Sequence, residues 1–359
     1  MEEIKNFRRL MREDKELVFY AENENYYPYL EGLLAELGKP VHYITSDHSG
    51  DYYINKLFPA LMPFIKCKVF VMTMTDLNQF YIKRSIYPVH YVYVFHSLVS
   101  THMIYRAGAF DYYDSILCVG PHQIDEIRQY ESIYGLKPKE LVEAGYYRLE
   151  ELYKEYKDHE REGKGVNVLV APTWGSTNLM EVCGRKILDM LVQEGYCVTL
   201  RLHPETVKRE GFTEYRGVKL ETSVASMDSL IEADILITEW SGIGLEYAFG
   251  TERPVIFIDT PPKVRNPKYK ELGIEPIESK LRSEIGVVVS PDELEKLPKI
   301  IEGMIGRREE YRSRLSELRW KYVYNFGSSS KVGADYIRSL CGGLKHSEVC
   351  LPRWGMACL

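Results

Sequence analysis

The sequence of 359 residues contains no long hydrophobic run. Nothing approaches 18 consecutive apolar residues, and no apolar stretch near residue 1 is typical of a signal peptide. Basic charge is not in excess either, because 46 Lys and Arg stand against 52 Asp and Glu, which gives a net charge of −6. We therefore expect a cytoplasmic protein that spans no membrane and does not bind nucleic acid by neutralising its phosphates.

Paired cysteines and clustered metal ligands are also absent. The seven cysteines form no Cys-x-x-Cys pair, and Cys67, Cys118 and Cys197 lie inside apolar runs, where reduced thiols are usual. The sequence has neither an Asp-x-Asp motif nor a cluster of His and Asp residues. It therefore predicts a protein of a reducing compartment, with no bound metal and no other resident cofactor.

Short apolar runs alternate with helical patterns along most of the chain. This alternation predicts an α/β architecture, in which parallel sheets are covered by helices on both faces. Because the chain is too long for one ordinary core, we expect two Rossmann-like domains that face each other across a cleft. Residues 1–155 would form the first domain and residues 165–325 the second, joined by a charged connection at 153–165.

One strand-to-helix turn in residues 233–250 has the features of a phosphate site. An apolar strand there ends in Thr238-Glu239-Trp240-Ser241-Gly242, and a helical segment follows. Main-chain amides at a helix amino terminus, with the positive end of the helix dipole behind them, suit a phosphate. Ser241 is equally suited to be an ordinary helix N-cap, so the local pattern leaves both interpretations open.

Two further polar motifs follow strands of the second half. Thr173 and Trp174 follow the first of these strands, and Arg201 and His203 close the next one. Arg201 and His203 are two residues apart, so both point to the same side of an extended strand. In a parallel sheet these motifs meet at the carboxyl edge, where a guanidinium and an imidazole suit a pyrophosphate. The alternative for His203 is a loop histidine that caps the turn at Pro204.

His96 ends an apolar strand of the first half and would face the cleft between the domains. An imidazole of near-neutral pKa can take a proton from an alcohol, which a transfer to a hydroxyl acceptor requires. The alternative is a core histidine that is hydrogen-bonded to the main chain. His102 and His122 compete for the same role, but neither closes a strand, and His90 opens the strand at the opposite edge of the sheet.

The ordered set of motifs resembles the CDP-glycerol glycerophosphotransferase family of teichoic-acid and capsule synthesis, whose members have a GT-B fold. The resemblance covers roughly residues 90–340. The motifs that carry it are Phe95-His96-Ser97, Gly108-Ala109-Phe110-Asp111, Gly145-Tyr146-Tyr147-Arg148-Leu149-Glu150, Pro172-Thr173-Trp174, Arg201-Leu202-His203-Pro204, Thr238-Glu239-Trp240-Ser241-Gly242 and Tyr324-Asn325-Phe326-Gly327-Ser328-Ser329. The chain departs from the family pattern at four of these positions: Ser97 replaces a usual Gly, Gly242 a second Ser, Glu239 an Asp and Tyr147 a Pro.

The resemblance implies a transferase that moves a polyol phosphate from a CDP-linked donor substrate onto a hydroxyl and releases CMP. His96 would deprotonate the acceptor, and His203 would be the second catalytic residue, holding the pyrophosphate. The donor-binding residues would be Thr173, Trp174, Arg201, Glu239, Ser241, Gly242, Glu246 and Arg148. The residues at 326–359 would form a helix that crosses back to the first domain and a tail.

The resemblance also implies a lipid-linked or glycan acceptor, and therefore peripheral contact with the cytoplasmic face of the membrane. The candidate contacts with anionic lipid are Lys137, Lys139, Lys154, Lys157, Arg161 and Lys164. Their alternative is an ordinary solvated helix face, because acidic residues are interspersed among them.

Two other functions stay open at this point. Many GT-B glycosyltransferases hold the nucleotide ribose with a carboxylate at the position of Glu246, so a transferase that uses a nucleotide sugar fits as well. The altered His96-Ser97 segment is compatible with an inactive nucleotide- or glycan-binding protein that kept the fold.

Overall fold

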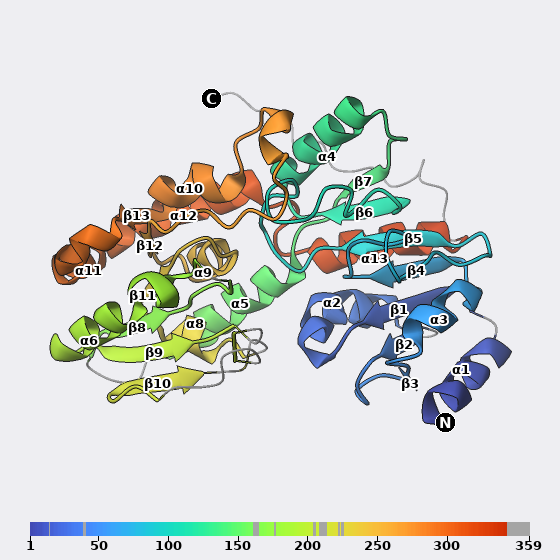
Figure 1. Ribbon diagram of the computed structural model, residues 1–359, viewed down its shortest axis with the longest axis horizontal. Coiled ribbons are helices and arrows are strands. Elements are labelled where there is room, and N and C mark those ends of the chain that lie inside the picture. The colour runs from blue at the N-terminus through green and yellow to red at the C-terminus, as the bar shows by residue number, and fades with distance from the viewer. Residues whose placement is uncertain are drawn as a thin grey trace.

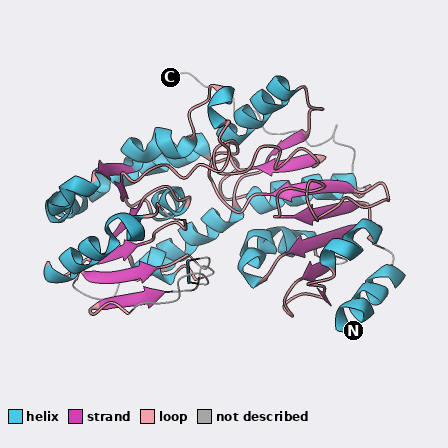
Figure 2. Cartoon of the chain, viewed as in Figure 1, coloured by secondary structure: helices cyan, strands magenta, loops and turns pink. Residues whose placement is uncertain are grey.

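The computed structural model describes residues 1–13, 15–38, 41–160, 165–175, 177–203, 206–207, 214–221, 223 and 226–342. They form two α/β domains, each built on one parallel sheet, which lie side by side in Figure 1. Figure 2 shows the two groups of strands flanked by helices. Every strand pair is parallel, so the predicted α/β fold class with two parallel sheets is confirmed.

The first domain is organised on a seven-stranded sheet with the strand order β3-β2-β1-β4-β5-β6-β7. Its strands are β1 (Leu17–Ala21), β2 (His42–Thr45), β3 (Tyr52–Tyr53), β4 (Val69–Met72), β5 (His90–Val94), β6 (Ser115–Cys118) and β7 (Glu140–Glu143). Its helical elements are α1 (Glu2–Arg12), η1 (Glu24–Tyr26), α2 (Tyr27–Leu37), α3 (Phe58–Leu61), η2 (Met62–Phe64) and α4 (Pro121–Tyr134). β1 and β4 are buried along their whole length, as apolar runs in a sheet covered on both faces should be.

The second domain is organised on a six-stranded sheet with the strand order β10-β9-β8-β11-β12-β13. Its strands are β8 (Asn167–Val170), β9 (Cys197–Arg201), β10 (Val218–Glu221), β11 (Ile235–Thr238), β12 (Val255–Ile258) and β13 (Gly286–Val289). Its helical elements are η3 (Met180–Gly184), α6 (Arg185–Gln193), α8 (Asp228–Glu232), α9 (Ile243–Thr251), η4 (Tyr269–Leu272), α10 (Ile277–Ile285), η5 (Pro291–Lys296), α11 (Leu297–Gly306) and α12 (Arg308–Tyr322). α9 is apolar on all sides because it lies in the centre of the domain, where nearly all its residues are buried.

In both sheets the order of the strands reverses next to the first strand, between β1 and β4 in one sheet and between β8 and β11 in the other. Chain segments leave the carboxyl ends of the strands in opposite directions at such a point, which leaves a crevice where ligands bind. The motifs predicted to carry function all follow strands, namely β5, β8, β9 and β11. The topology therefore brings them to the ligand-binding edges of the two sheets.

Two helices link the domains. α5 (Tyr147–Asp158) runs past residue 155 and packs against α2 of the first domain and α9 of the second, so the start of the predicted connection is an ordered helix. α13 (Ser329–Leu340, red in Figure 1) follows the second domain in the chain but packs against α2 and β7 of the first. The Tyr336 hydroxyl of α13 donates a hydrogen bond to Glu140 in β7 at 3.0 Å. The tail at 343–359 lies outside the described residues.

Candidate active site

A cavity of about 480 Å³ lies between the two domains, and residues of both line it. The loops after β5, β8, β9 and β11 all contribute to the lining. Every residue predicted for the site from the sequence lines this cavity, with the exception of Glu239. The structure therefore brings residues that are up to 150 positions apart, from His96 to Glu246, into one site.

The turn after β11 presents unpaired main-chain amides to the cavity. Gly242 is the N-cap of α9, and no side chain caps this helix. The N–H groups of Ser241, Gly242 and Ile243 donate to no acceptor within the described ranges. The Ser241 hydroxyl is thus not used as an N-cap, and the turn has the free donors and the helix dipole that favour a phosphate.

Gly242 also lies against the loop that follows β5 in the other domain. A Cβ atom at position 242 would collide with the Ser97 hydroxyl and would lie 2.9 Å from Cγ1 of Val99. The φ angle of Gly242 is −59°, so the glycine is required by this close approach and not by its backbone conformation. Ser97 and Gly242 are two of the departures from the family pattern, and they face each other across the domain boundary.

We expect these two departures to compensate each other. Gly242→Ser should weaken CDP binding about tenfold, because the added atoms push Ser97 and its domain away from the phosphate turn. Ser97→Gly in the same chain should restore most of that affinity, since it removes the colliding hydroxyl. Isothermal titration of wild type, both single variants and the double variant measures this coupling. Strictly additive effects would show that the contact between Ser97 and Gly242 does not limit binding.

Arg201 and His203 both reach the cavity, as their spacing along β9 predicted. Arg201 is buried; its Nη1 donates to the Ser229 hydroxyl at 3.2 Å and lies 3.7 Å from a carboxylate oxygen of Glu221. The ring of His203 lies 6.0 Å from that of Trp174. A fixed guanidinium and a less buried imidazole at one strand end provide charge and N–H donors for a phosphate group.

Lys263 and Arg265 line the cavity as well, although neither belongs to a motif that pointed to the site. Lys263 Nζ donates to the Thr173 hydroxyl at 2.7 Å and lies 4.4 Å from the ring centroid of Trp174, which Arg265 approaches to 5.6 Å. Burial lowers the pKa of Lys263 to about 8, while the nearby Glu239 opposes that shift. The second domain therefore has two more cations in its half of the cavity than were predicted.

Glu239 is buried below the cavity surface and supports the loop after β8. Its Oε1 accepts the Thr173 N–H at 2.7 Å. Burial raises the pKa of Glu239 to about 7, against the hydrogen bonds from the main chain of Thr173 and Leu179 and the charge of Lys263. Its position favours a role in holding Thr173 in place, and direct donor binding by Glu239 stays an untested prediction.

Glu246 lies on α9 at the inner end of the cavity. Its Oε1 accepts a hydrogen bond from the Tyr146 hydroxyl at 3.1 Å. Burial raises the pKa of Glu246 to about 7, although the bond from Tyr146 and the charges of Arg148 and Arg201 lower it. A carboxylate in this position can accept bonds from hydroxyls such as those of a ribose.

His96 lines the cavity from the first domain, where it is the predicted catalytic residue. The rings of Tyr26, Tyr29 and Tyr105 surround it, with centroids at 5.5, 6.0 and 6.2 Å. Burial lowers the pKa of His96 to about 4, and a hydrogen bond with the main chain of Thr73 opposes the shift only weakly. The imidazole is therefore neutral at pH 7, but its pKa lies well below the near-neutral value expected from the sequence, so it is a weaker base than that expectation assumed.

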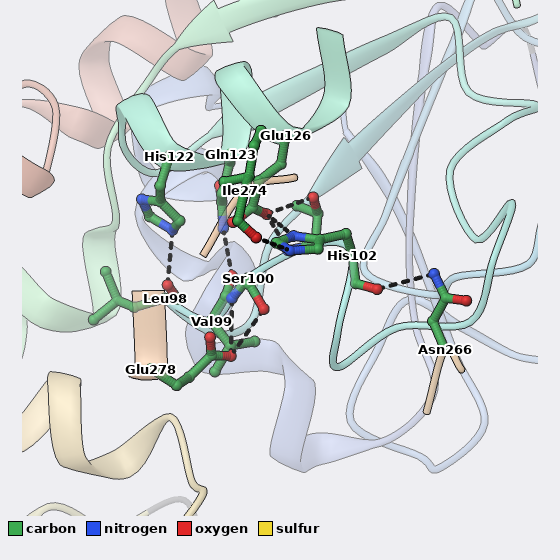
Figure 3. A network of polar contacts seen from close by, with 11 residues as sticks. Leu98, Val99, Ser100, His102, His122, Gln123, Glu126, Asn266, Ile274 and Glu278 are labelled. Carbon is green, nitrogen blue, oxygen red and sulfur yellow. Dashed lines mark hydrogen bonds and ion pairs between the residues drawn. The ribbon is translucent and has the colours of Figure 1, made fainter. Parts of the chain in front are cut away.

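The loop that follows His96 is held by buried polar contacts on both sides, which Figure 3 shows. The N–H of Ser100 donates to Glu278 on α10 of the second domain at 2.9 Å, and Asn266 donates to the carbonyl of His102 at 3.0 Å. On the side of its own domain, Thr101 donates to Glu126 on α4 through its hydroxyl at 2.7 Å. These contacts fix the position of His96 relative to the donor half of the cavity.

The competing histidines belong to this network and not to the cavity lining. His102 donates from Nε2 to the Ile274 carbonyl at 3.1 Å, and its Nδ1 lies 3.3 Å from Glu126. His122 donates from Nε2 to the Leu98 carbonyl at 2.9 Å. The bond of His102 crosses the domain boundary, whereas that of His122 stays within the first domain. Of these three histidines, His96 is the one that lines the cavity.

The described part of the chain has neither a membrane-spanning helix nor a cluster of metal ligands. No helix there is long and apolar enough to span a bilayer. No group of three or more His, Cys, Asp or Glu side chains there is arranged to hold a metal ion.

Comparisons with known proteins agree with the geometry. Residues 106–261 match the profile of the family described as CDP-Glycerol:Poly(glycerophosphate) glycerophosphotransferase. The teichoic acid glycerol-phosphate primase of Bacillus subtilis (strain 168) is 24% identical over 160 residues, which are 42% of this chain and 40% of the primase. The aligned region therefore spans less than half of that curated relative.

Solved structures resemble the whole chain. A structure of the wall teichoic acid polymerase TagF has a TM-score of 0.64 at 13% identity, with 96% of this chain and 95% of that chain covered. UDP-GlcNAc 2-epimerase from Neisseria meningitidis, bound to UDP-GlcNAc, has a TM-score of 0.57 at 10% identity, with 91% and 100% covered. At such low identity these likenesses establish the GT-B fold and nothing more. The profile match over residues 106–261 confirms the resemblance to the CDP-glycerol glycerophosphotransferase family that the motifs had indicated.

Proposed function

We propose that this protein transfers glycerol phosphate, or a similar polyol phosphate, from a CDP-linked donor to a hydroxyl acceptor in the synthesis of teichoic acid or a related capsule polymer. One observation carries the proposal: the cavity combines the free amides and cations of the second domain with a neutral imidazole from the first. The family match over residues 106–261 and the similarity to a teichoic acid glycerol-phosphate primase support this choice of donor and polymer.

The reaction joins the acceptor oxygen to the phosphorus next to the polyol and breaks the bond from that phosphorus to the bridging oxygen of the pyrophosphate. His96 takes the acceptor proton as this new bond forms. The bridging oxygen leaves with CMP, and its developing charge is stabilised by His203, Arg201 and the amides at Ser241 and Gly242. Such catalysis consists mainly of positioning and electrostatics, for which two rigid sheets facing one cavity suffice.

We assign the remaining contacts with the donor to other residues that line the cavity. Glu246 would accept hydrogen bonds from the ribose, with Arg148 beside it. Trp174 offers a ring face on which the base can stack, and Lys263 lies over the same ring as a counter-charge for phosphate. The CDP-linked polyol is a substrate in this proposal. That no metal takes part stays a prediction, which turnover after dialysis against a chelator would test.

The affinity for CDP should be highest between about pH 7 and pH 8. Below pH 7, Glu246, whose pKa burial raises to about 7, takes up a proton and loses acceptor capacity for the ribose. Above pH 8, Lys263, whose pKa burial lowers to about 8, loses its charge. Titrations with CDP from pH 5.5 to 9 should show that the affinity declines at both ends of this range. The decline at acid pH should be smaller in Glu246→Gln, and the decline at alkaline pH should be smaller in Lys263→Arg. Identical profiles in wild type and both variants would contradict these assignments.

The main alternative is a GT-B glycosyltransferase that uses a nucleotide sugar. The position of Glu246 suits that function equally well, because both donors contain a nucleotide ribose. Titration with CDP, UDP and GDP separates the two, since the proposed function requires a preference for CDP of at least about tenfold. An equal or stronger affinity for UDP would favour the alternative, and no affinity for any of the three would favour an inactive relative.

The acceptor is proposed to be lipid-linked, and the first domain has a surface that suits contact with a membrane. We call this the aromatic–basic surface; it consists of Phe64, Phe80, Tyr81, Ile86, Tyr87 and Tyr112 with Lys66, Lys83 and Arg106. Tyr81 is 68% exposed and Ile86 70% exposed, which is unusual for side chains of this size. Residues 77–90 contain no Asp or Glu, in a protein whose net charge is −6.

Direct contacts join the parts of the aromatic–basic surface. Lys66 lies over the ring of Tyr87 at 5.9 Å, Arg106 lies over that of Phe80 at 5.3 Å, and Ile86 donates its N–H to Pro63 at 2.9 Å. Exposed rings among basic side chains match the interface of an anionic bilayer, where rings enter the headgroup region and cations meet phosphates. We therefore propose contact with the cytoplasmic membrane face through this surface.

The basic residues chosen from the sequence suit that role less well. Lys139 is buried with its Nζ 3.2 Å from Glu131, and Lys157 is paired with Glu252 at 2.8 Å. Arg161 and Lys164 lie outside the described residues. Lys154 is exposed on α5, where a solvated helix face remains the better interpretation, and Lys137 is exposed in the loop between α4 and β7.

Vesicle flotation tests the membrane contact. Wild type should float with vesicles that contain about a third phosphatidylglycerol at low salt, less at high salt, and little with phosphatidylcholine alone. The double variant Tyr81→Ser, Ile86→Ser should lose about tenfold in binding, since it removes two exposed apolar contacts. Ile133→Ser, an exposed position on α4, is the matched control. Binding that is unchanged in the double variant would contradict the choice of surface.

A further inference from the structure

The turn after β11 carries one aromatic side chain, Trp240, between Glu239 and Ser241. Trp240 is half-buried and lines the cavity. Its Nε1–H donates a hydrogen bond to the carbonyl of Thr260 at 2.8 Å, and Thr260, which is only 3% exposed, lies two residues beyond the end of β12. The turn is therefore bonded through its side chain to the segment that leaves the neighbouring strand.

That segment carries two cations of the cavity, Lys263 and Arg265. Lys263 Nζ donates to the hydroxyl of Thr173, which follows β8, at 2.7 Å. Because β11 lies between β8 and β12 in the sheet, Lys263 spans the turn after β11. The N–H of Arg265 donates to the carbonyl of Met103 in the first domain at 3.0 Å. The bond from Trp240 and the bond to Met103 thus hold the segment on either side of Lys263.

The ring of Trp240 rests on Arg282 of α10. The guanidinium carbon of Arg282 lies 4.2 Å from the ring centroid. The guanidinium also donates to the carboxylate of Asp259 at 3.0 Å and to the carbonyl of Ile258 at 3.2 Å. Arg282 is only 7% exposed, so its planar group is fixed by these bonds and offers the indole a flat surface that is shielded from water. This support determines the direction in which the Nε1–H of Trp240 points.

The same helix also contacts the first domain. Glu278 lies one turn before Arg282 on α10 and accepts the N–H of Ser100 at 2.9 Å, in the loop that follows His96 (Figure 3). α10 therefore supports Trp240 with one side chain and the His96 loop with another. A segment that is fixed relative to α10 is fixed relative to both halves of the cavity.

From these contacts we propose that Trp240 is a positioning residue, which holds the segment with Lys263 and Arg265 beside the free amides of the turn after β11. The turn then binds the phosphates of the donor with its main chain and sets the position of two cations with its side chain. This inference rests on the proposed function, because the group that the amides and cations receive is the pyrophosphate of a CDP-linked donor.

Trp240→Phe tests the inference, because phenylalanine keeps an aromatic ring on Arg282 but has no N–H. The buried carbonyl of Thr260 then lacks its partner and the segment shifts, so the affinity for CDP should fall about tenfold in isothermal titration. The value of kcat at saturating donor should change less than about threefold, because the base His96 keeps its place. Trp320→Phe, at an exposed position on α12, is the matched control and should bind CDP as wild type does.

Two further measurements show whether Trp240 acts through the cations. In a chain that already carries Lys263→Met, Trp240→Phe should weaken CDP binding less than about threefold, since a main part of what Trp240 positions is gone. Burial lowers the pKa of Lys263 to about 8, while the charge of Glu239 opposes this shift and that of Arg265 adds to it. A displaced, hydrated lysine keeps its charge to higher pH, so the decline of CDP affinity above pH 8 should be smaller in Trp240→Phe than in wild type.

Wild-type affinity in a folded Trp240→Phe overturns the inference but leaves the proposed function standing. An equal loss with and without Lys263→Met also overturns it, because Trp240 would then contact the donor itself. If wild type binds no CDP, both the inference and the proposed function fail. If Trp240→Phe does not fold, Arg282→Lys, which keeps the charge beside Asp259 but not the flat surface, should lose about threefold in CDP affinity with the same smaller decline above pH 8. An Arg282→Lys protein that matches wild type in both respects contradicts the inference.

Discussion

Replacing His96 with alanine should lower turnover about 10²–10⁴-fold while leaving the affinity for CDP nearly unchanged. The neutral imidazole is the group in the first-domain wall that can accept a proton, and it lies on the opposite side of the cavity from the donor contacts. Loss of a base affects the transition state, whereas the phosphate turn and the cations that bind CDP stay in place. A turnover assay and an isothermal titration on the same preparation measure the two quantities.

The matched control for this variant is His90→Gln. His90 lies at the other end of the same strand, where its Nε2 is 2.9 Å from the Ser115 hydroxyl, far from the chemistry. It should keep wild-type activity. If His96→Ala is as active as wild type, then His96 has only a structural role. If it fails to fold, His96→Gln is the variant to assay, since it retains the size and polarity of the side chain.

Replacing His203 with alanine should reduce kcat/KM about 10²–10³-fold and should weaken CDP binding as well. The imidazole belongs to the donor side, and in the proposed mechanism its hydrogen bond to phosphate would exist before the reaction and strengthen as charge develops on CMP. His203→Asn should recover part of the loss, because the amide can still donate a hydrogen bond. A loss of turnover in His203→Ala with full CDP affinity would show that His203 does not contact the donor in the ground state.

Most of the fold was predictable because strands and turns carry local signals. The apolar runs at residues 17–21 and 235–238 are fully buried strands. Asn23 and Asn25 after the first run, and Ser241 and Gly242 after the second, line the cavity. The carboxyl ends of parallel strands share one edge, so the residues after β5, β8, β9 and β11 could be grouped without knowing any contact.

Features that depend on packing between domains could not be predicted. Lys263 and Arg265 come from an irregular segment after β12, which has no periodicity to draw attention to it. The contact between Ser97 and Gly242 joins residues of different domains. Residues 291–322 are almost continuously helical, as η5, α11 and α12, and the break between α11 and α12 lies at Arg307, where φ is −107°. Their helix-forming side chains give no sign of the break, because the packing of the second domain determines it.

Whether the reaction releases CMP or CDP tests the central claim most directly. Incubation with CDP-glycerol labelled in the glycerol, in the presence of an acceptor, should release CMP and place both glycerol and one phosphate on the acceptor. That result requires cleavage of the pyrophosphate between the cations and the free amides of the second domain. Release of CDP, with glycerol transferred alone, would mean that the carbon–oxygen bond breaks, as in a glycosyltransferase, and would contradict the account.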